Sequence, residues 1–430
     1  AKLTGKPGVT LGLELLKDDS KQVTNVEYFA NGKLIKSGTG AAELSWTPPG
    51  SGAFQLSARV TMADGSKSTS SATPVIITGV GTTPLKGSYT GAVSDNSTQK
   101  AAAGTGTVQI STTSSGAKGS YSMRLVLNGT ALVAAGKFDA ESVATPSVTV
   151  RTGETPKTYR VRFQQEATGF SDTISGVVTD GSLSASGEPS GGSFASSFVA
   201  SRNVWSASNT AGTLAGKYTM TLPLMDDSKD AALGTSLVTL SPLGLVSGKF
   251  FLNDGSRITT SGVVSKDGIW QPYVSLYSKQ GFLTGSVDFS DKGQTGWVSG
   301  DLYWRQDAAK LSNLDALGGV YVAPAKGSVF AVKGAKSNIT IAIAEGGLKE
   351  AIKETATLTS TNVIQVPTPN TRHLVFRLDR ATGALSGSFT APGDTTATPV
   401  TGVVFQTQKK AVGYFTRNGH TGTIEITANP

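Results

Sequence analysis

Residues 26–35 of the sequence read Val-Glu-Tyr-Phe-Ala-Asn-Gly-Lys-Leu-Ile. Apolar side chains lie on both sides of an Asn-Gly pair at positions 31 and 32. A two-residue hairpin turn needs a positive φ at both central residues, and Asn-Gly adopts it readily. The stretch therefore predicts an antiparallel β-hairpin.

Further strand patterns follow this hairpin at short intervals. Leu-Ser-Trp at 44–46, an alternating run at 54–60 and Val-Ile-Ile at 75–77 are separated by turn residues at 48–50 and 64–65. Short strands at a spacing of roughly 8–12 residues are typical of a β-sandwich. We expect one small antiparallel domain over residues 1–80.

Residues 26–77 also resemble a bacterial Ig-like domain. The resemblance lies in VEYFANGKLI, in LSWTPPGSGAFQLSARVTMADGS and in the closing VIIT. It implies a sandwich that serves as a spacer or binding module in exported surface proteins. Trp46 is then expected to be a core aromatic rather than a ligand platform.

An internal repeat is the most informative feature of residues 81–430. GSYTG at 87–91 matches GKYTM at 216–220, which aligns Tyr89 with Tyr218, 129 residues apart. Gly119 aligns with Gly248 at the same interval, and ISGVV at 174–178 aligns with VSGDL at 298–302. Matches in one order indicate a duplicated module.

The predicted fold class is all-β: an N-terminal Ig-like sandwich followed by tandem antiparallel β-barrel or sandwich modules. The predicted domains are residues 1–80, 81–214, 215–310 and a diverged third copy at 311–430. Helix is expected only near 346–354, where Leu348 and Ile352 are spaced i, i+4. The neighbouring run 339–343 alternates like a strand.

Residues 81–430 resemble Gly-rich β modules of large exported surface proteins of environmental bacteria. The resemblance lies in GKYTMTLP, VSKDGIWQPYVSLYSKQGFLTGSVDF, VSGDLYW and TGVVFQTQKKAVGYFTRNGHTGTIEI. That family has no assigned activity, so the resemblance implies location and architecture only. We expect a secreted protein of the cell surface, whose export signal has been removed.

Composition agrees with such a protein. The chain has 430 residues, no cysteine and a net charge of +8, and its charged residues make up only 16%. The charge suits an acidic polysaccharide, or is a solvated surface. Lys and Arg are scattered, so we expect no nucleic-acid partner. No apolar run is long enough to span a membrane as a helix.

Catalytic and cofactor motifs are missing from the sequence. No nucleophile elbow, phosphate loop or dinucleotide fingerprint occurs, and the two histidines, His373 and His420, lie in strand-like surroundings. The densest acidic cluster is Asp226, Asp227 and Asp230, which lacks the spacing of a calcium loop. We expect no enzyme activity, no cofactor and no metal.

Aromatic residues are the best candidates for a binding surface. Five of them define a candidate glycan surface, because flat rings stack on sugars: Trp270, Tyr273, Tyr277, Trp297 and Trp304. The alternative is that these rings belong to a β core. Asn96, Asn128 and Asn338 lie in sequons, and the sequence leaves open whether they are glycosylated.

A candidate assembly strand lies at 8–15, which reads Gly-Val-Thr-Leu-Gly-Leu-Glu-Leu. Its apolar residues alternate, at Val9, Leu11, Leu13 and Leu15. Such a strand either pairs within its own domain or is donated to a neighbouring chain. The sequence therefore predicts a non-enzymatic extracellular structural protein that self-associates into a fibre or surface assembly. The alternative is an adhesin that binds carbohydrate at the cell surface through its aromatic residues.

Overall fold

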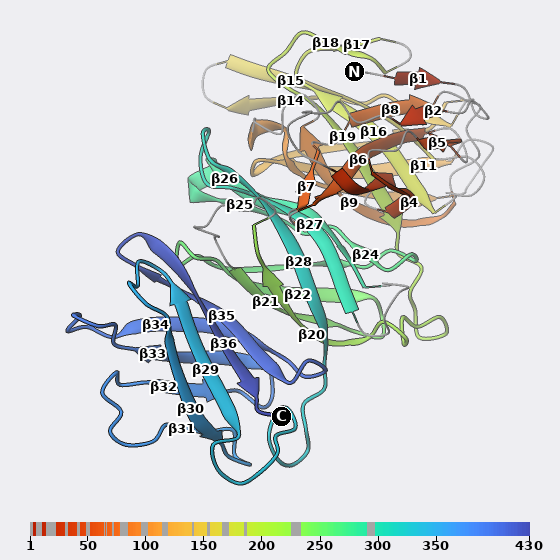
Figure 1. Cartoon of the computed structure of the whole chain (residues 1–430). Coiled ribbons are helices and arrows are strands. Elements are labelled where there is room, and N and C mark those ends of the chain that lie inside the picture. Colours follow the sequence, from red (N-terminus) through yellow and green to blue (C-terminus); the bar gives the residue numbers. More distant parts are fainter. Residues whose placement is uncertain are drawn as a thin grey trace. The chain divides into compact units, whose positions relative to one another are not determined.

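The computed structural model (Figure 1) confirms the all-β class. In the residues it describes, the elements are strands and two short 3₁₀ turns, η1 (Ala102–Gly104) and η2 (Tyr277–Lys279). The described residues are 3–5, 11–13, 23–30, 33–40, 44–48, 52–63, 65, 67–70, 73–77, 85–95, 102–113, 119–139, 142–152, 155–165, 172–184, 187–224, 234–289 and 297–430.

The chain divides into two compact units. One holds residues 1–205, 262–287 and 302–313, and the other holds 206–261, 288–301 and 314–430. Within each unit β-sheets enclose apolar cores, and the described strands pair antiparallel except for Leu3–Gly5, which pairs in parallel with Thr73–Ile77.

The N-terminal sheet has the order β1-β8-β6-β3-β4, with β7 also on β6. A second, two-stranded sheet pairs β2 with β5. Their bounds are β1 (Leu3–Gly5), β2 (Leu11–Leu13), β3 (Val23–Ala30), β4 (Lys33–Thr39), β5 (Leu44–Trp46), β6 (Gly52–Met62), β7 (Lys67–Thr69) and β8 (Thr73–Ile77). Trp46 is 7% exposed and meets Phe54 edge-on at 5.2 Å between ring centroids, so it is a core aromatic as expected.

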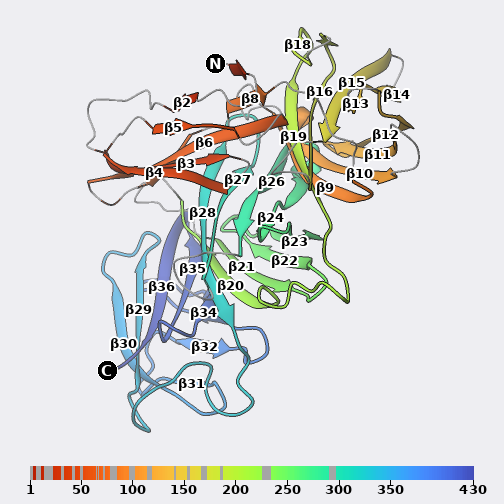
Figure 2. The same ribbon diagram turned by 90° about the vertical axis from the view of Figure 1, so that its right-hand side faces the viewer.

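The first barrel has the strand order β12-β11-β10-β9-β19-β16-β15-β13, with β14 also on β15. Figure 2 shows β9 to β12 as successive strands. Their bounds are β9 (Gly87–Asp95), β10 (Gly106–Thr113), β11 (Ser120–Leu127), β12 (Thr130–Lys137), β13 (Val143–Ala144), β14 (Ser147–Thr152), β15 (Thr155–Gln165), β16 (Thr173–Thr179) and β19 (Ala195–Arg202). A small ribbon of β17 (Ser182–Leu183) and β18 (Pro189–Ser190) lies outside this order.

The second sheet has the order β23-β22-β21-β20-β28-β27-β26-β24, with β25 also on β26. Its bounds are β20 (Gly216–Leu222), β21 (Gly234–Leu240), β22 (Leu245–Phe251), β23 (Arg257–Val263), β24 (Ile269–Trp270), β25 (Tyr273–Leu276), β26 (Gly281–Asp288), β27 (Trp297–Arg305) and β28 (Leu311–Tyr321). Strand for strand, this order reproduces that of the first barrel.

The third barrel has the order β31-β30-β29-β36-β35-β34-β33-β32. Its bounds are β29 (Ile339–Glu345), β30 (Ile352–Leu358), β31 (Ile364–Gln365), β32 (Val375–Leu378), β33 (Ala384–Phe389), β34 (Thr398–Phe405), β35 (Lys410–Arg417) and β36 (His420–Ala428). Ile339, Ile341 and Ile343 are fully buried and alternate with partly exposed residues, so the strand pattern predicted for 339–343 is confirmed.

The three larger sheets share one feature of strand pairing. The first strand pairs with the last: β9 with β19, β20 with β28 and β29 with β36. These pairings join the two halves of each sheet into one nearly closed barrel, whose edge strands are those at the two ends of the sheet order. We propose that each barrel is one module of the chain.

The module boundary predicted at residue 310 needs correction. Strand β28 (Leu311–Tyr321) is paired with β20, from Lys217 opposite Tyr321 to Thr221 opposite Leu317. Residues 311–321 therefore complete the second sheet. The sequence Gly-Gly-Val-Tyr-Val at 318–322 resembles the Gly-Lys-Tyr-Thr-Met that opens the second sheet at 216–220. The physical reason for the error is that first and last strands are neighbours, so similar residues serve both.

Register supports one predicted equivalence and corrects another. Tyr89 and Tyr218 are each the third residue of the opening strand. Tyr89 lies opposite Ile110, which lies opposite Met123, whereas Tyr218 lies opposite Val238, which lies opposite Gly248. Gly248 therefore corresponds to Met123 and not to Gly119, which precedes β11 and has a φ of +61°.

Two local predictions can be compared with the backbone. Ala30 lies opposite Lys33, so the predicted hairpin at 26–35 is confirmed. The helical turn predicted near 346–354 is wrong: Gly346 and Gly347 have φ of +60° and +70°, and β30 starts at Ile352. Two consecutive positive φ values are incompatible with a right-handed helix.

Candidate functional site

The candidate glycan surface does not form as one exposed platform. Trp270 is 1% exposed and Trp304 is 2% exposed, so neither ring face is open to a sugar. The indole of Trp270 packs against Gly262, where a Cβ would lie 2.7 Å from Nε1. Trp304 donates a hydrogen bond from Nε1 to the Tyr277 hydroxyl at 3.0 Å. The two tryptophans are core residues, so the prediction that they form part of a glycan surface is wrong.

The two tyrosines of the set are half-buried. Burial raises the pKa of the Tyr273 hydroxyl, although Thr105 and Ser275 lower it through hydrogen bonds. Tyr277 opens the η2 turn, in which three consecutive non-glycine residues have φ of +50°, +53° and +74°. The side chain of Trp297 lies outside the described residues. Among the four members of the set whose side chains are described, Tyr273 and Tyr277 keep some exposed surface.

The candidate assembly strand is paired within its own chain over the part that is described. Leu11 lies opposite Trp46 and Leu13 opposite Leu44, in antiparallel pairing of β2 with β5. This pairing is three residues long. Val9 and Leu15 lie outside the described residues.

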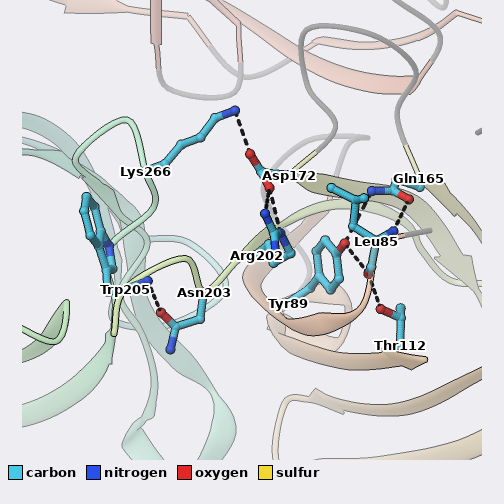
Figure 3. A network of polar contacts seen from close by, with 9 residues as sticks. All are labelled: Leu85, Tyr89, Thr112, Gln165, Asp172, Arg202, Asn203, Trp205 and Lys266. Atoms are coloured by element: carbon cyan, nitrogen blue, oxygen red, sulfur yellow. Dashed lines mark hydrogen bonds and ion pairs between the residues drawn. The ribbon is translucent and has the colours of Figure 1, made fainter. Parts of the chain in front are cut away.

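A polar network that the sequence did not single out lies in the unit that holds the first barrel (Figure 3). Asp172, just before β16, accepts hydrogen bonds from Arg202 Nε at 2.6 Å and from Lys266 Nζ at 2.9 Å. The Arg202 backbone N–H donates to the Asp172 carbonyl at 2.6 Å. One carboxylate therefore joins the end of β19 to the turn between β23 and β24.

A tyrosine corner forms the second half of the network. The Tyr89 hydroxyl donates to the Leu85 carbonyl at 2.8 Å, and Thr112 Oγ1 donates to the same oxygen at 2.5 Å. Gln165 accepts from the Leu85 N–H at 2.7 Å and donates to the Tyr89 hydroxyl at 3.3 Å. The segment ahead of β9 is thereby tied to β10 and β15.

The same corner recurs in the second sheet. Tyr218 donates its hydroxyl hydrogen to the carbonyl of Leu214, four residues earlier, as Tyr89 does to Leu85. The repeated tyrosine was the sequence signal that marked this position. Its partners were not visible in the sequence, because Gln165 and Thr112 come from distant strands.

Electrostatics indicate a structural rather than a proton-transfer role for this network. Burial by itself would raise the pKa of Asp172, but hydrogen bonds from Lys266 and Arg202 outweigh it and hold the pKa below its usual value. Burial raises the pKa of Tyr89 to about 12. Asp172 is therefore ionised and Tyr89 neutral at pH 7, and neither titrates where a general acid or base must.

Histidines and acidic residues add no second site. His373 precedes β32 and His420 opens β36, and both are exposed. The acidic cluster at Asp226, Asp227 and Asp230 lies outside the described residues. Among the residues that the structure describes, no group of three His, Cys, Asp or Glu side chains is arranged to hold a metal ion. Over the same part, no helix is long and apolar enough to cross a membrane.

The sequons differ in accessibility. Asn338 is 3% exposed, and its side-chain oxygen accepts from the Leu358 N–H at 2.7 Å. A buried, hydrogen-bonded amide is not a glycan acceptor in the folded chain. Asn128 is partly exposed in the turn between β11 and β12, has a φ of +44°, and its side-chain oxygen accepts a hydrogen bond from Ser275 Oγ at 3.4 Å. Asn96 lies outside the described residues.

Comparison with known proteins gives no family. No family matches the chain, and no curated protein matches it. A crystal structure of a transferrin binding protein B double mutant, a vaccine antigen from Haemophilus parasuis, is 12% identical, over 97% of this chain and 96% of that one, with a TM-score of 0.21. A protein of unknown function from Nostoc punctiforme is 8% identical, over 55% and 96%, with a TM-score of 0.20.

Scores this low carry no argument about function, so the architecture rests on the strand pairings themselves. The resemblances to Ig-like domains and to Gly-rich surface modules stay predictions.

Proposed function

We propose that the chain is a non-enzymatic extracellular structural protein, a subunit of a cell-surface fibre or assembly that grows by β-strand addition. The observation that carries the proposal is the series of nearly closed barrels, in each of which the first strand pairs with the last. A series of folded modules makes an extended and stiff chain, and such a structural role needs no catalytic centre.

The chemistry of the described residues supports a structural role. Asp172 is engaged by two cations, and the best-formed polar network holds segments together. Asp180 is held in the same way, by Lys157 at 2.7 Å and by Ser193. Ionisable side chains in these clusters therefore serve as cross-links.

An extracellular surface location is part of the proposal. It rests on the low charge of the sequence and on the surface-protein resemblances of residues 26–77 and 81–430. Low charge and Gly-rich strands suit closely packed β modules. The proposed partner is a second copy of the chain.

Light scattering and negative-stain microscopy of the purified chain test the proposal. We expect species well above the 44.1 kDa of one chain, with growth that depends on concentration. A chain that stays monomeric at high concentration would exclude a self-assembling subunit. Binding on a glycan array by such a monomer would support the adhesin instead, with the half-buried Tyr273 and Tyr277 as candidate contacts.

Deletion of residues 1–15 tests the mode of growth. We expect the shortened chain to remain folded and to lose polymer growth, because the donated strand is gone. If the shortened chain polymerises as well as the full chain, strand donation by this segment is excluded while assembly stands.

A further inference from the structure

The seam of the first barrel is formed by two strands that face each other without a ladder. In the described pairings, β12 pairs with β11 and β14 pairs with β15. Cα atoms of β12 and β14 come within 8 Å, whereas paired strands lie about 4.5–5.5 Å apart at opposite residues. We call the facing edges of Thr130–Lys137 and Ser147–Thr152 the seam.

The third barrel shows what a joined seam looks like. There the strands at the two ends of the sheet order are linked by a bridge between Val363 and Arg377. The Leu378 N–H also donates to the Asn362 carbonyl at 3.4 Å. The first barrel has no bridge of this kind between its described seam residues.

Three apolar side chains at the seam are less buried than the residues of the core they pack against. Ala134, Val148 and Val150 pack against the core but are only partly buried. Residues on the inner face of more central strands, such as Ile110 and Met123, are 0% exposed. The seam therefore combines partly exposed apolar side chains with two strand edges. The backbone groups of such edges are templates for pairing with another chain.

The outer side of β12 carries no device that blocks such pairing. Ala131, Val133 and Ala135 are exposed, and Val133 is 63% exposed. The strand has no proline and no charge before Lys137. Strand β4, at the edge of the N-terminal sheet, has Lys33 and Lys36 instead, the usual protection of an edge.

We propose that the seam accepts the strand 8–15 donated by a second copy of this chain. The inference rests on the proposed function, for which it names the acceptor. Alternate residues Val9, Leu11 and Leu13 match the apolar side of the seam, and Thr10 and Gly12 match its small, uncharged outer side. The donor is held in its own chain by only three residue pairs in the described part.

Charge supports the same occupant. Glu14 follows the apolar part of the donor, and a cation stands near an end of each seam strand, Lys137 on β12 and Arg151 on β14. A glutamate at the end of the inserted strand therefore has a basic partner in either strand direction. Contacts of this head-to-tail kind build filaments when they do not close into a ring.

Insertion requires the seam to widen. Two ladders around one added strand place β12 and β14 about 9.6 Å apart, twice the usual strand spacing. Strand β14 is separated from β13 by Thr145 and Pro146, and the Pro146 carbonyl accepts a hydrogen bond from the Val161 N–H of β15 at 2.9 Å, so β14 and β15 would move together. The donor would complete both ladders, which offsets the cost of opening.

Val133→Lys is the first test, because it places a lysine on the open edge. Val375→Lys is the matched control, since Val375 is also 63% exposed but lies on β32 of the third barrel. We expect Val133→Lys to reduce the polymer fraction in light scattering by at least tenfold and Val375→Lys to leave it unchanged. Circular dichroism checks that both variants fold, and Ala135→Lys replaces the first variant if it does not.

Engineered thiols give the second test, since the natural chain has no cysteine. Affinity-tagged Thr10→Cys chain is mixed with untagged Val133→Cys chain and oxidised, with Val375→Cys as control. We expect a mixed disulfide dimer with Val133→Cys only. If the chain polymerises but Val133→Lys behaves as the control and no mixed dimer forms, the seam is not the acceptor and assembly stands. A chain that never polymerises overturns both proposals.

Discussion

At the scale of single residues, buried carboxylates in this protein act as cross-links between strands. Asp180 accepts hydrogen bonds from the Ser193 N–H at 2.7 Å, from Ser193 Oγ at 2.5 Å and from Lys157 Nζ at 2.7 Å. Burial would raise the pKa of Asp180, but these bonds and one from the Phe194 N–H lower it to about 2. The charged carboxylate is therefore the form that the fold stabilises.

Asp180→Asn should lower the free energy of unfolding at pH 7 by about 1.5–3 kcal/mol, the range for hydrogen bonds to a charged group. The folded pKa lies below the unfolded value of about 3.9, so the contribution of Asp180 is present above pH 4 and lost as the pH falls towards 2. Thermal unfolding of both chains at pH 7 and pH 3 measures this difference.

The matched control is Glu350→Gln, which changes an exposed carboxylate in the turn before β30. We expect it to alter stability by less than about 0.5 kcal/mol. An Asp180→Asn deficit that stays constant from pH 7 to pH 2 would contradict the assignment of the charged form.

At the scale of elements, several strands approach so closely that only glycine fits. Gly106 opens β10 and lies opposite Leu127 of β11. A Cβ on Gly106 would stand 1.8 Å from the Val126 carbonyl oxygen, a backbone atom that cannot turn away. The pairing of β10 with β11 thus depends on the missing side chain.

Gly106→Ala should destabilise the first barrel by several kcal/mol or shift the β10–β11 register, because backbone must move to admit the methyl group. Thr107→Ala, one residue further on the same strand, is the control and should cost far less. Hydrogen exchange of β10 and β11 amides reads out the effect. Equal protection in the two variants would show that the strands can separate without penalty.

At the scale of the whole molecule, the barrels were predicted as modules and can be tested as such. The third barrel closes β29 on β36 and has its own core, which includes Ile341, Phe389 and Phe415. Tyr321 packs into that core from β28, and the Thr219 hydroxyl donates to the Val404 carbonyl at 2.6 Å. The barrel therefore has a complete sheet and some support from its neighbour in the same unit.

A fragment of residues 318–430 should fold alone, with a strand-type circular dichroism spectrum and a cooperative thermal transition below that of the full chain. Its sheet is complete, while the bond from Thr219 is lost. A fragment without a transition would mean that the third barrel is not an independent module.

The all-β class, the hairpin at 26–35 and the repeat could be predicted from the sequence, because each depends on local residue patterns. Asn-Gly at 31–32 needs only its own backbone preference to turn the chain, and alternation at 339–343 needs only a strand with one buried face. The pair Tyr89 and Tyr218 shows that a repeated residue marks a repeated position. These features depend on residues close together in the chain.

Burial of the aromatic rings and the order of the strands in each sheet depend on long-range contacts, so they are known from the three-dimensional structure and not from the sequence. Trp270 and Trp304 look the same in sequence whether they face a core or a solvent, and burial depends on strands far away in the chain. Residues 311–321 were separated from the second sheet because closure pairs a first strand with a last one, about 100 residues on. Asp172, Arg202 and Lys266 meet for the same reason, since long-range pairing and not sequence spacing brings their charges together.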